Sequence, residues 1–170
     1  VLHDVDLHVP HGRRIAVVGA TGAGKTTLGA IAAATLPASS GSVTLDGRPL
    51  DSLDPATVRR HVVLVSQEVH VFAGTVADNL RLADGTADDD ALGDALARCG
   101  ADAWVRALPE GLETVVGDLA HPLTPAQAQQ LALARVVLGD PDVVVLDEAT
   151  AEAGSAGARD LEAAALAVVE

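Results

Sequence analysis

Two short stretches, far apart in the chain, combine residue types that suit phosphate and magnesium chemistry. The first, Gly19–Thr26, reads Gly-Ala-Thr-Gly-Ala-Gly-Lys-Thr and matches the phosphate-loop pattern G-x-x-x-x-G-K-[ST]. Glycines let a backbone curl so that successive N–H groups point at phosphate oxygens, and a helix start adds the positive end of its dipole. The ammonium of Lys25 suits β- and γ-phosphates, and the hydroxyl of Thr26 suits Mg²⁺, which prefers oxygen ligands. The predicted nucleotide-binding residues are Gly19, Ala20, Thr21, Gly22, Ala23, Gly24, Lys25, Thr26 and Thr27.

Lysine occurs once in the chain, at Lys25, and the other ten of the eleven basic residues are arginine. A single lysine among arginines suggests that its position needs a compact ammonium group. The alternative is a glycine-rich turn that binds no ligand, and the lone lysine argues against it. By itself the motif does not separate an ATPase from a GTPase or a small-molecule kinase.

The second stretch places two carboxylates, Asp147 and Glu148, directly after the apolar run Val143–Leu146. In an open α/β sheet, ligands bind at the carboxyl ends of the strands. We expect Asp147 to hold Mg²⁺, directly or through water, and Glu148 to polarise an attacking water as a general base. The alternative is that both carboxylates only cap the following turn, and the presence of a phosphate loop argues against it.

Apolar runs predict the elements that must position these groups. Arg14–Val18 predicts a buried strand leading into the loop, and the residues from Lys25 to about Thr35 predict a helix. Val62–Val65 predicts another strand, and Val143–Leu146 predicts one that is buried on both faces. Strands separated by helical stretches indicate an α/β fold with a mainly parallel sheet.

The residues from about 75 to 135 show helical patterns and predict a block inserted between two sheet strands. Leu92, Leu96 and Cys99 recur at helix spacing, and a further helix is expected to begin near Pro125. The acidic run Thr86–Asp90 is interpreted as a solvated helix start, because acids favour that end of the helix dipole. The segment from residue 158 onward is also expected to be helical.

Composition limits the class of protein. The chain has 170 residues, enough for one domain with a core, and its only aromatic rings outside histidine are Phe72 and Trp104. No apolar run approaches the ~18 residues that a membrane helix needs. Cys99 is the only cysteine, which excludes an internal disulfide. A formal net charge of −13 disfavours nucleic acid as a partner.

The order of these motifs resembles the nucleotide-binding domain of ABC transporters, of the exporter type, along essentially the whole chain. Val65–Glu68 is similar to the family's glutamine loop, in which Gln67 would contact Mg²⁺ and the attacking water. Val71–Leu80 looks like the segment that follows this loop in exporter-type members, and Leu123–Arg135 occupies the place of the family signature. Asp147–Thr150 matches the family's acidic motif.

This resemblance implies a P-loop NTPase of RecA-like type, with a mainly parallel sheet core and an inserted α-helical subdomain. Residues 1–170 would form a single ABC ATPase domain, with 1–70 and 136–170 in the core and 71–135 in the helical subdomain. It implies ATP and Mg²⁺ as ligands, with Thr26, Gln67 and Asp147 at the metal. The implied partners are a second ABC ATPase domain and a transmembrane transporter domain at the cytoplasmic face of the cell membrane, and no nucleic acid.

The signature departs from the family's Leu-Ser-Gly-Gly-Gln. The residues expected to face the partner's nucleotide are Thr124, Pro125, Ala126 and Gln127. Thr124 keeps a hydroxyl, Pro125 removes a backbone N–H, and Ala126 adds a Cβ where the family relies on close backbone approach. Thr124 and Pro125 still predict a helix start, as cap and first position, with a weaker grip on the partner's ATP. The alternative is that these changes are functionally silent.

A second departure lies after the acidic motif, where Ala151–Gly154 replaces the family's Ser-Ala-Leu-Asp while Glu148 is intact. We therefore expect one half of an asymmetric heterodimer, with Glu148 and Gln67 as its catalytic residues. The family's adenine-stacking aromatic residue would precede Val1, and its switch histidine would follow Glu170. We therefore expect these 170 residues alone to bind nucleotide weakly and to hydrolyse little.

Two other functions remain open at this point. One is a nucleotide-gated module that closes on ATP without useful turnover, which the altered signature favours and Glu148 opposes. The other is a soluble ABC ATPase that acts on DNA or ribosomes, which the charge of −13 and the exporter-like Val71–Leu80 disfavour. A kinase or GTPase explains neither Gln67 nor Leu123–Arg135, and no Asn-Lys-x-Asp guanine-reading motif is present.

Overall fold

The computed structural model describes residues 2–66, 68–117, 120–147, 163–165 and 168. The two predicted catalytic residues, Gln67 and Glu148, lie outside these ranges. So do Ala151–Gly154 and most of the C-terminal segment that was expected to be helical.

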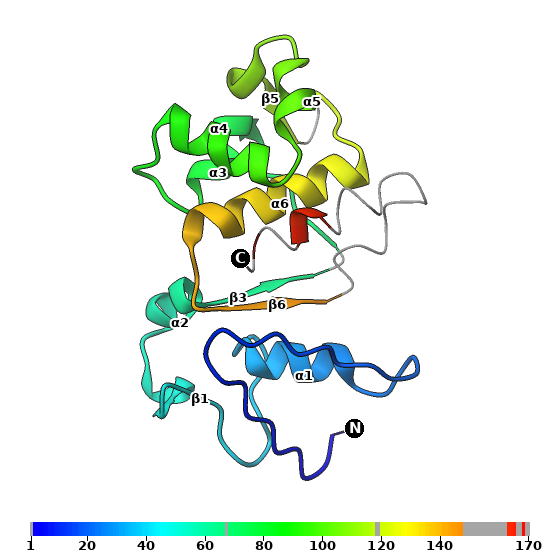
Figure 1. Cartoon of the computed structure of the whole chain (residues 1–170), viewed down its shortest axis with the longest axis vertical. Helices are drawn as coiled ribbons and strands as arrows, with labels where there is room; N and C mark the ends of the chain where they lie inside the picture. Colours follow the sequence, from blue (N-terminus) through cyan, green and yellow to red (C-terminus); the bar gives the residue numbers. More distant parts are fainter. Residues whose placement is uncertain (1, 67, 118–119, 148–162, 166–167, 169–170) are drawn as a thin grey trace.

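A pair of parallel strands lies at the centre of the molecule (Figure 1). These are β3 (Val62–Val65) and β6 (Val143–Leu146), paired in register from Val62 opposite Val143 to Val65 opposite Leu146. Both strands coincide with the apolar runs that predicted them. Because successive side chains point to opposite faces of a strand, the pair offers apolar side chains to helices on both sides.

Helices α1 (Lys25–Ala32) and α6 (Pro125–Gly139) cover opposite faces of this pair (Figure 1). On the α1 face, a Cβ built at Gly29 would lie 3.1 Å from Val145 Cγ1, so the helix approaches the strand closely there. On the α6 face, Val65 belongs to the main hydrophobic core, and Val63 and Val144 pack against it. The result is a layer of strands between two helices, which confirms an α/β fold with parallel strands.

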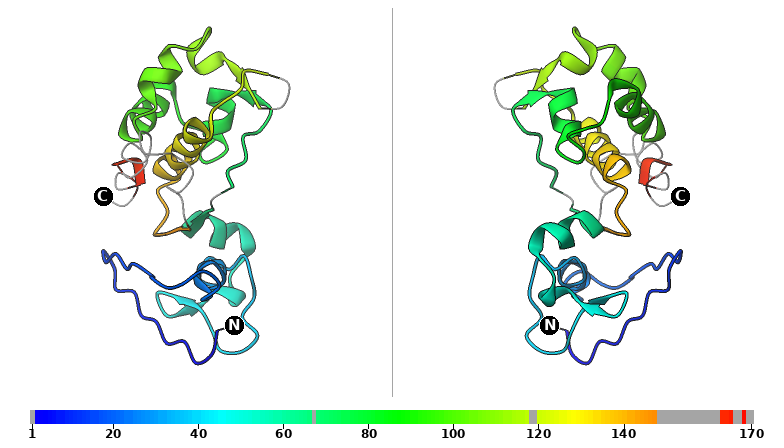
Figure 2. Two further views of the ribbon diagram at one scale, coloured as in Figure 1. Left: turned by 90° about the vertical axis from the view of Figure 1, so that its right-hand side faces the viewer. Right: turned by 90° about the vertical axis from the view of Figure 1, so that its left-hand side faces the viewer.

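The hydrophobic core lies mainly among α6 and three shorter helices, α3 (Val76–Arg81), α4 (Asp89–Arg98) and α5 (Asp102–Arg106). These helices form the upper part of the molecule in Figures 1 and 2. The fully buried large side chains are Val76, Asn79, Leu80, Leu92, Leu96, Cys99, Val116, Leu131 and Leu133. All four helices lie between β3 and β6 in the chain, as their patterns predict. Their assignment as the family's inserted subdomain, and the division at residues 71 and 135, stay predictions.

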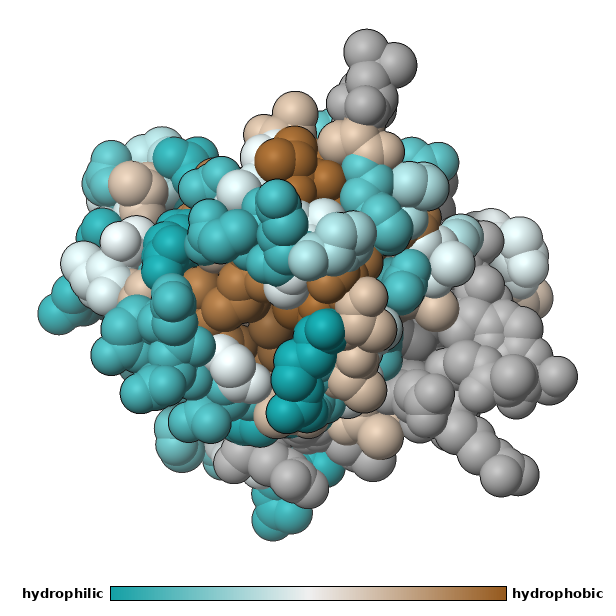
Figure 3. Space-filling view, turned by 90° about the horizontal axis from the view of Figure 1, so that it is seen from above, coloured by the Kyte–Doolittle hydropathy of each residue, from teal (hydrophilic) through white to brown (hydrophobic). Residues whose placement is uncertain are grey.

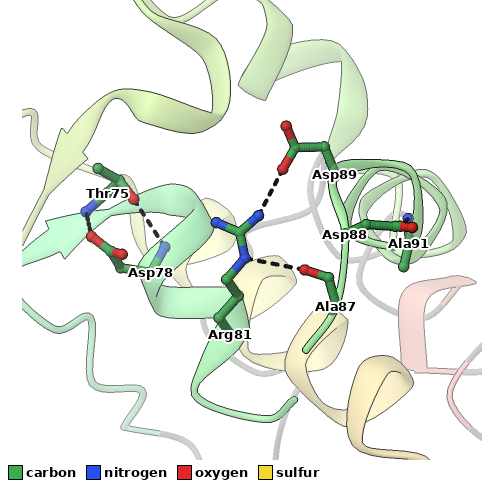
Figure 4. A network of polar contacts seen from close by, with 7 residues as sticks. All are labelled: Thr75, Asp78, Arg81, Ala87, Asp88, Asp89 and Ala91. Carbon is green, nitrogen blue, oxygen red and sulfur yellow. Dashed lines mark hydrogen bonds and ion pairs between the residues drawn. The ribbon is translucent and has the colours of Figure 1, made fainter. Parts of the chain in front are cut away.

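Helix starts in this part are capped by their own sequence. Thr75 and Asp78 form a reciprocal capping box at α3, with hydrogen bonds of 2.9 Å in each direction (Figure 4). Asp88 caps α4, and Arg81 joins the two helices by donating to Ala87 O at 3.1 Å and to Asp89 at 2.7 Å. The acidic run that includes Asp88 and Asp89 is therefore a helix start, as predicted.

The remaining described strands are short. β1 (Thr44–Leu45) and β2 (Arg48–Pro49) form a hairpin, and β4 (Gly74–Thr75) pairs antiparallel with β5 (Val115–Val116). The described strands thus make one parallel and two antiparallel pairs. Helix α2 (Pro55–His61) leads into β3, and two 3₁₀ turns, η1 (Leu50–Ser52) and η2 (Gly111–Glu113), complete the elements.

Two expectations about buried strands are wrong. Arg14–Val18 is not a strand, and Ile15, Val17 and Val18 are 46%, 49% and 91% exposed. A strand needs a neighbour whose backbone groups complete its hydrogen bonds, and within the described residues β6 pairs only with β3. For the same reason β6 is only partly buried, with Leu146 36% exposed, rather than enclosed on both faces.

Apolar side chains reach the surface above the helices. Figure 3 looks down on this part and shows a hydrophobic centre ringed by hydrophilic residues. Among the large apolar side chains between residues 70 and 116, Phe72, Leu82 and Val115 are 47%, 59% and 50% exposed. None of the described helices has both the length and the apolar character required to cross a bilayer.

Candidate functional site

The phosphate loop leads directly into α1. Gly22 and Gly24 have φ angles of 83° and 96°, a region that favours glycine, and Ala23 N donates to Ala20 O at 3.1 Å to tighten the turn. Gly24 occupies the N-cap of α1, where a glycine has no side chain to offer the first helical N–H groups. These donors and the helix dipole therefore make the start of α1 suitable for an anion.

Lys25 folds its side chain back over the loop. Its Nζ donates hydrogen bonds to the carbonyl oxygens of Gly19 at 3.0 Å and Ala20 at 3.2 Å. These bonds hold the only lysine of the chain at the mouth of the loop, next to the start of α1. The cation, the glycines and the uncapped helix start together fit the phosphates of a nucleotide.

The carboxyl ends of β3 and β6 lie side by side. Asp147 N donates to Val65 O at 2.9 Å, which extends the parallel ladder one residue beyond β6. This bond places Asp147 beside the point where the chain continues from β3 to Ser66 and Gln67. A carboxylate oxygen at the carboxyl end of a sheet strand is a suitable ligand for Mg²⁺.

Figure 1 shows that α1 begins on the side of the molecule where β3 and β6 end. The helix runs back along the pair, in contact with β6, so that Gly29 meets Val145. Lys25 and Asp147, which are 122 positions apart in the sequence, therefore come to the same edge of the sheet. This is the arrangement that the two motifs require for a shared site.

The altered signature forms a regular helix start. Thr124 is the N-cap of α6 and Pro125 is its first residue. Thr124 Oγ1 accepts from Gln127 N at 3.3 Å, and Gln127 Oε1 accepts from Thr124 N at 2.9 Å. This reciprocal capping box confirms the prediction that Thr124 and Pro125 begin a helix. The same box occupies both polar side chains of the motif in local bonds.

The signature and the phosphate loop belong to different layers of the molecule. α6 lies on one face of the β3–β6 pair and α1 on the other (Figures 1 and 2). The structure therefore brings Lys25 and Asp147 to one edge but keeps Thr124 on the layer above them.

A hollow of about 370 Å³ links the signature to the chain that follows β3. It is lined by Val69, His70, Val71, Gly117, Pro122, Leu123 and Ala128. The segment after Gln67 and the residue before Thr124 thus share one surface. This proximity was not predicted, because the two segments are more than 50 positions apart in the sequence.

Sequence reasoning also missed a polar cluster around Arg135, in the middle of α6. Its guanidinium donates to His70 O, to Asn79 O and to Asn79 Oδ1, and burial lowers the pKa of the group from its usual value. The available signal was one charged residue inside the apolar run Leu131–Leu138. Such a residue needs buried partners, but periodicity does not say where they are.

Comparison with known proteins identifies a family and several relatives of this chain. Residues 2–151 match the profile of the family described as ABC transporter. The mitochondrial potassium channel ATP-binding subunit of Xenopus tropicalis is 35% identical over 165 residues, covering 96% of this chain and 24% of the relative.

Two bacterial proteins are similar to the same degree. The ATP-dependent lipid A-core flippase of Chromobacterium violaceum is 36% identical over 163 residues, covering 96% of this chain and 28% of the relative. The uncharacterized ABC transporter ATP-binding protein YknV of Bacillus subtilis is 36% identical over 150 residues, covering 88% and 25%. The chain thus spans about a quarter of the length of the curated relatives it matches.

Proposed function

Because this chain belongs to the ABC transporter family, we propose that it binds and hydrolyses ATP to power a transporter, as one half of an asymmetric pair. Members of this family are ATPases coupled to transport. One observation carries the proposal for this chain: α1 begins, with Lys25, at the sheet edge where Asp147 N is bonded to Val65 O. This arrangement supports one site shared by the phosphate loop and the acidic motif.

Each residue of this site has a proposed role. The loop from Gly19 to Thr27 would cradle the phosphates of ATP, with the ammonium of Lys25 moving from its carbonyl partners to phosphate oxygens. Thr26, Asp147 and Gln67 would hold Mg²⁺, whose charge offsets the charge that develops on the β- and γ-phosphates. Glu148 would accept a proton from the attacking water as general base, oriented with Gln67.

A second ABC ATPase domain is the proposed partner across the nucleotide. The layer separation between Thr124 and Lys25 supports it, because one chain does not bring both to the same edge. Closure on ATP and reopening after hydrolysis would move an attached transmembrane domain at the cytoplasmic face of a membrane. The names of two relatives, an ATP-dependent flippase and a channel ATP-binding subunit, support a membrane role, and the flippase supports the exporter type.

The asymmetry is proposed from the signature. Pro125 has no N–H to donate, and Ala126 presents a Cβ at the start of α6. The capping box uses the side-chain oxygens of Thr124 and Gln127 as acceptors only, so the proposed asymmetry depends on Pro125 and Ala126. This chain would therefore serve its own phosphate-loop site well and the partner's site poorly.

The test uses the intact protein together with its natural partner chain. Lys25→Ala removes a charge-assisted contact worth about 1.5–3 kcal/mol, so ATP affinity should fall roughly 10- to 150-fold. Glu148→Gln should leave ATP binding intact and abolish most turnover. Arg106→Gln, a change at an exposed residue of α5, is the control that should alter neither ATP binding nor turnover. Turnover that survives Glu148→Gln nearly unchanged would contradict the proposed role of this site.

A second candidate is a nucleotide-gated module that closes on ATP without useful turnover. Pro125 and Ala126 favour it, because both weaken a signature helix start as a donor to phosphate. Single-turnover hydrolysis with the partner present separates the two functions. Product formation that depends on Glu148 supports the ATPase, and tight binding without product supports the gate.

A further inference from the structure

Arg135 joins α6 to two segments that come earlier in the chain. Its Nε donates to Asn79 O at 2.9 Å, Nη1 to His70 O at 3.0 Å, and Nη2 to Asn79 Oδ1 at 2.6 Å. All three acceptors are neutral, so the planar guanidinium is matched to carbonyl and amide oxygens rather than to an acid. Each donor points to a different acceptor, which specifies the geometry more closely than a single bond would.

Asn79 extends this contact to the segment before α3. It is only 1% exposed, and its Oδ1 also accepts from Phe72 N at 3.0 Å. Its Nδ2 donates to Phe72 O at 2.9 Å and to Thr75 O at 3.0 Å. The amide therefore pairs with both backbone groups of Phe72, and the bond from Arg135 to Oδ1 sets which way the amide faces.

The side chains of the segment complete the contact. The guanidinium carbon of Arg135 lies 5.5 Å from the centroid of the Phe72 ring, a cation–π distance. His70 meets the same ring edge to face, with centroids 4.7 Å apart and planes at 76°. His70 and Phe72 are both exposed, so these contacts hold a surface segment against a partly buried cation.

The opposite side of the segment is held by backbone. A Cβ at Gly117 would lie 2.9 Å from Ala73 N, Ala73 Cα and Phe72 O, so the two backbones touch there. Residues 70–75 thus contact Gly117, just after β5, and Arg135, in the C-terminal half of α6. The segment cannot shift relative to α6 without breaking the bonds of Arg135 or separating from Gly117.

We infer that Arg135 is a positioning residue that couples the end of β3 to the signature end of α6. The inference rests on the proposed function, because it connects this chain's own site to the signature that is proposed to face the partner's nucleotide. His70 comes three residues after Gln67, and Thr124 is eleven residues before Arg135, about 16 Å along the helix axis. A displacement at the end of β3 is therefore transmitted to α6 as a whole, and with it to Thr124.

The first test measures the contact itself by hydrogen exchange in the intact protein. Arg135→Gln removes the guanidinium donors, so exchange of amides in residues 70–75 should become at least about ten-fold faster. Arg135→Lys keeps the charge but not the planar fork and should give an intermediate rate. Arg106→Gln is the matched control, since among the described residues the side chain of Arg106 bonds Asp102 on its own helix. Unchanged exchange in residues 70–75, or an equal rise in β6 and α4, would overturn the inference.

The second test measures the coupling through steady-state hydrolysis with the partner chain. Arg135→Gln should lower kcat about ten-fold or more, because it releases the segment that follows the proposed catalytic Gln67 of this chain's own site. The KM for ATP should change less than two-fold, because the phosphate loop is untouched. Arg135→Lys should recover part of kcat. A raised KM with unchanged kcat would place Arg135 at nucleotide binding and contradict the inference. Absence of ATPase activity in the unmutated protein would count against the proposed function. The hydrogen-exchange experiment would still test the contact of Arg135, because it needs no turnover.

Discussion

The backbone N–H of Asp147 donates a hydrogen bond of 2.9 Å to the carbonyl oxygen of Val65. The bond extends the parallel ladder one residue beyond the last pair, Val65 and Leu146. The acidic motif therefore starts beside the point where the chain leaves β3. It involves only the backbone of Asp147. A substitution of the side chain can therefore remove the carboxylate and leave the sheet edge as it is.

Asp147→Asn should weaken the magnesium-dependent part of nucleotide binding roughly 10- to 100-fold, the range found for disturbed metal sites. The amide is a poorer Mg²⁺ ligand than a carboxylate because it carries no charge. Nucleotide titrations with Mg²⁺ and with EDTA measure the difference. The control is Asp142→Asn, the same change just before the other end of β6, where Asp142 pairs with His61. Equal magnesium dependence in both variants would show that Asp147 is not a ligand.

Thr124→Ala should destabilise the protein by about 1 kcal/mol, because it removes the hydroxyl that accepts from Gln127 N at the start of α6. Thr124→Ser keeps that acceptor and should stay within a few tenths of a kcal/mol of the unmutated protein. Urea unfolding followed by circular dichroism measures both. If the two variants unfold alike, the hydroxyl contributes nothing as a cap.

Two glycine-to-alanine changes should have opposite signs. Gly117 has a φ of 97° and backbone atoms 2.9 Å from a new Cβ, so Gly117→Ala should destabilise by about 1–3 kcal/mol. Gly93 lies within α4 with open space around its Cβ position, so Gly93→Ala should stabilise by about 0.5–1 kcal/mol. The comparison uses urea midpoints of the two variants. A stabilising Gly117→Ala would mean that β5 does not touch Ala73.

Cys99 should be inert toward thiol reagents until the protein unfolds. Its side chain is fully buried, and burial raises the pKa of the thiol to about 12. The nucleophile is the thiolate, and with this raised pKa almost no thiolate is present at about pH 8 in the folded state. Labelling with a chromogenic disulfide should be slow in buffer and rapid in urea. Rapid labelling in buffer would show that α4 opens locally.

Asp78 should make the start of α3 sensitive to acid. Its bond from the Thr75 backbone lowers the pKa of the carboxyl from the usual 3.8, so the folded state favours the charged form. This stabilisation is complete above the unfolded value and is lost as the pH falls through the lower folded pKa. The urea midpoint of Asp78→Asn should therefore lie below that of the unmutated protein at about pH 7, and the gap should close as the pH falls through the lowered folded pKa of Asp78. A gap that is constant with pH would contradict the charge effect.

Local sequence predicted those parts of the molecule that short-range physics determines. The glycines before Lys25 predicted the phosphate loop, since few other residues adopt the φ angles found at Gly22 and Gly24. Thr124 and Pro125 predicted the start of α6, because a hydroxyl cap and a fixed proline φ both act within one helical turn. The apolar runs of β3 and β6 likewise predicted strands at the observed residues.

Tertiary structure decided what depends on distant partners. Arg14–Val18 has the composition of a buried strand, yet it lacks a described neighbour to complete its hydrogen bonds and is exposed. The acceptors of Arg135 lie 56 and 65 positions earlier in the chain, and residue type alone does not identify them. Backbone preference and periodicity act over a few residues, whereas burial and buried hydrogen bonds depend on which segments the fold brings together. The residue types of Lys25 and Asp147 therefore predict phosphate and magnesium chemistry from the sequence alone, whereas the packing of α1 against β6 depends on the folded chain.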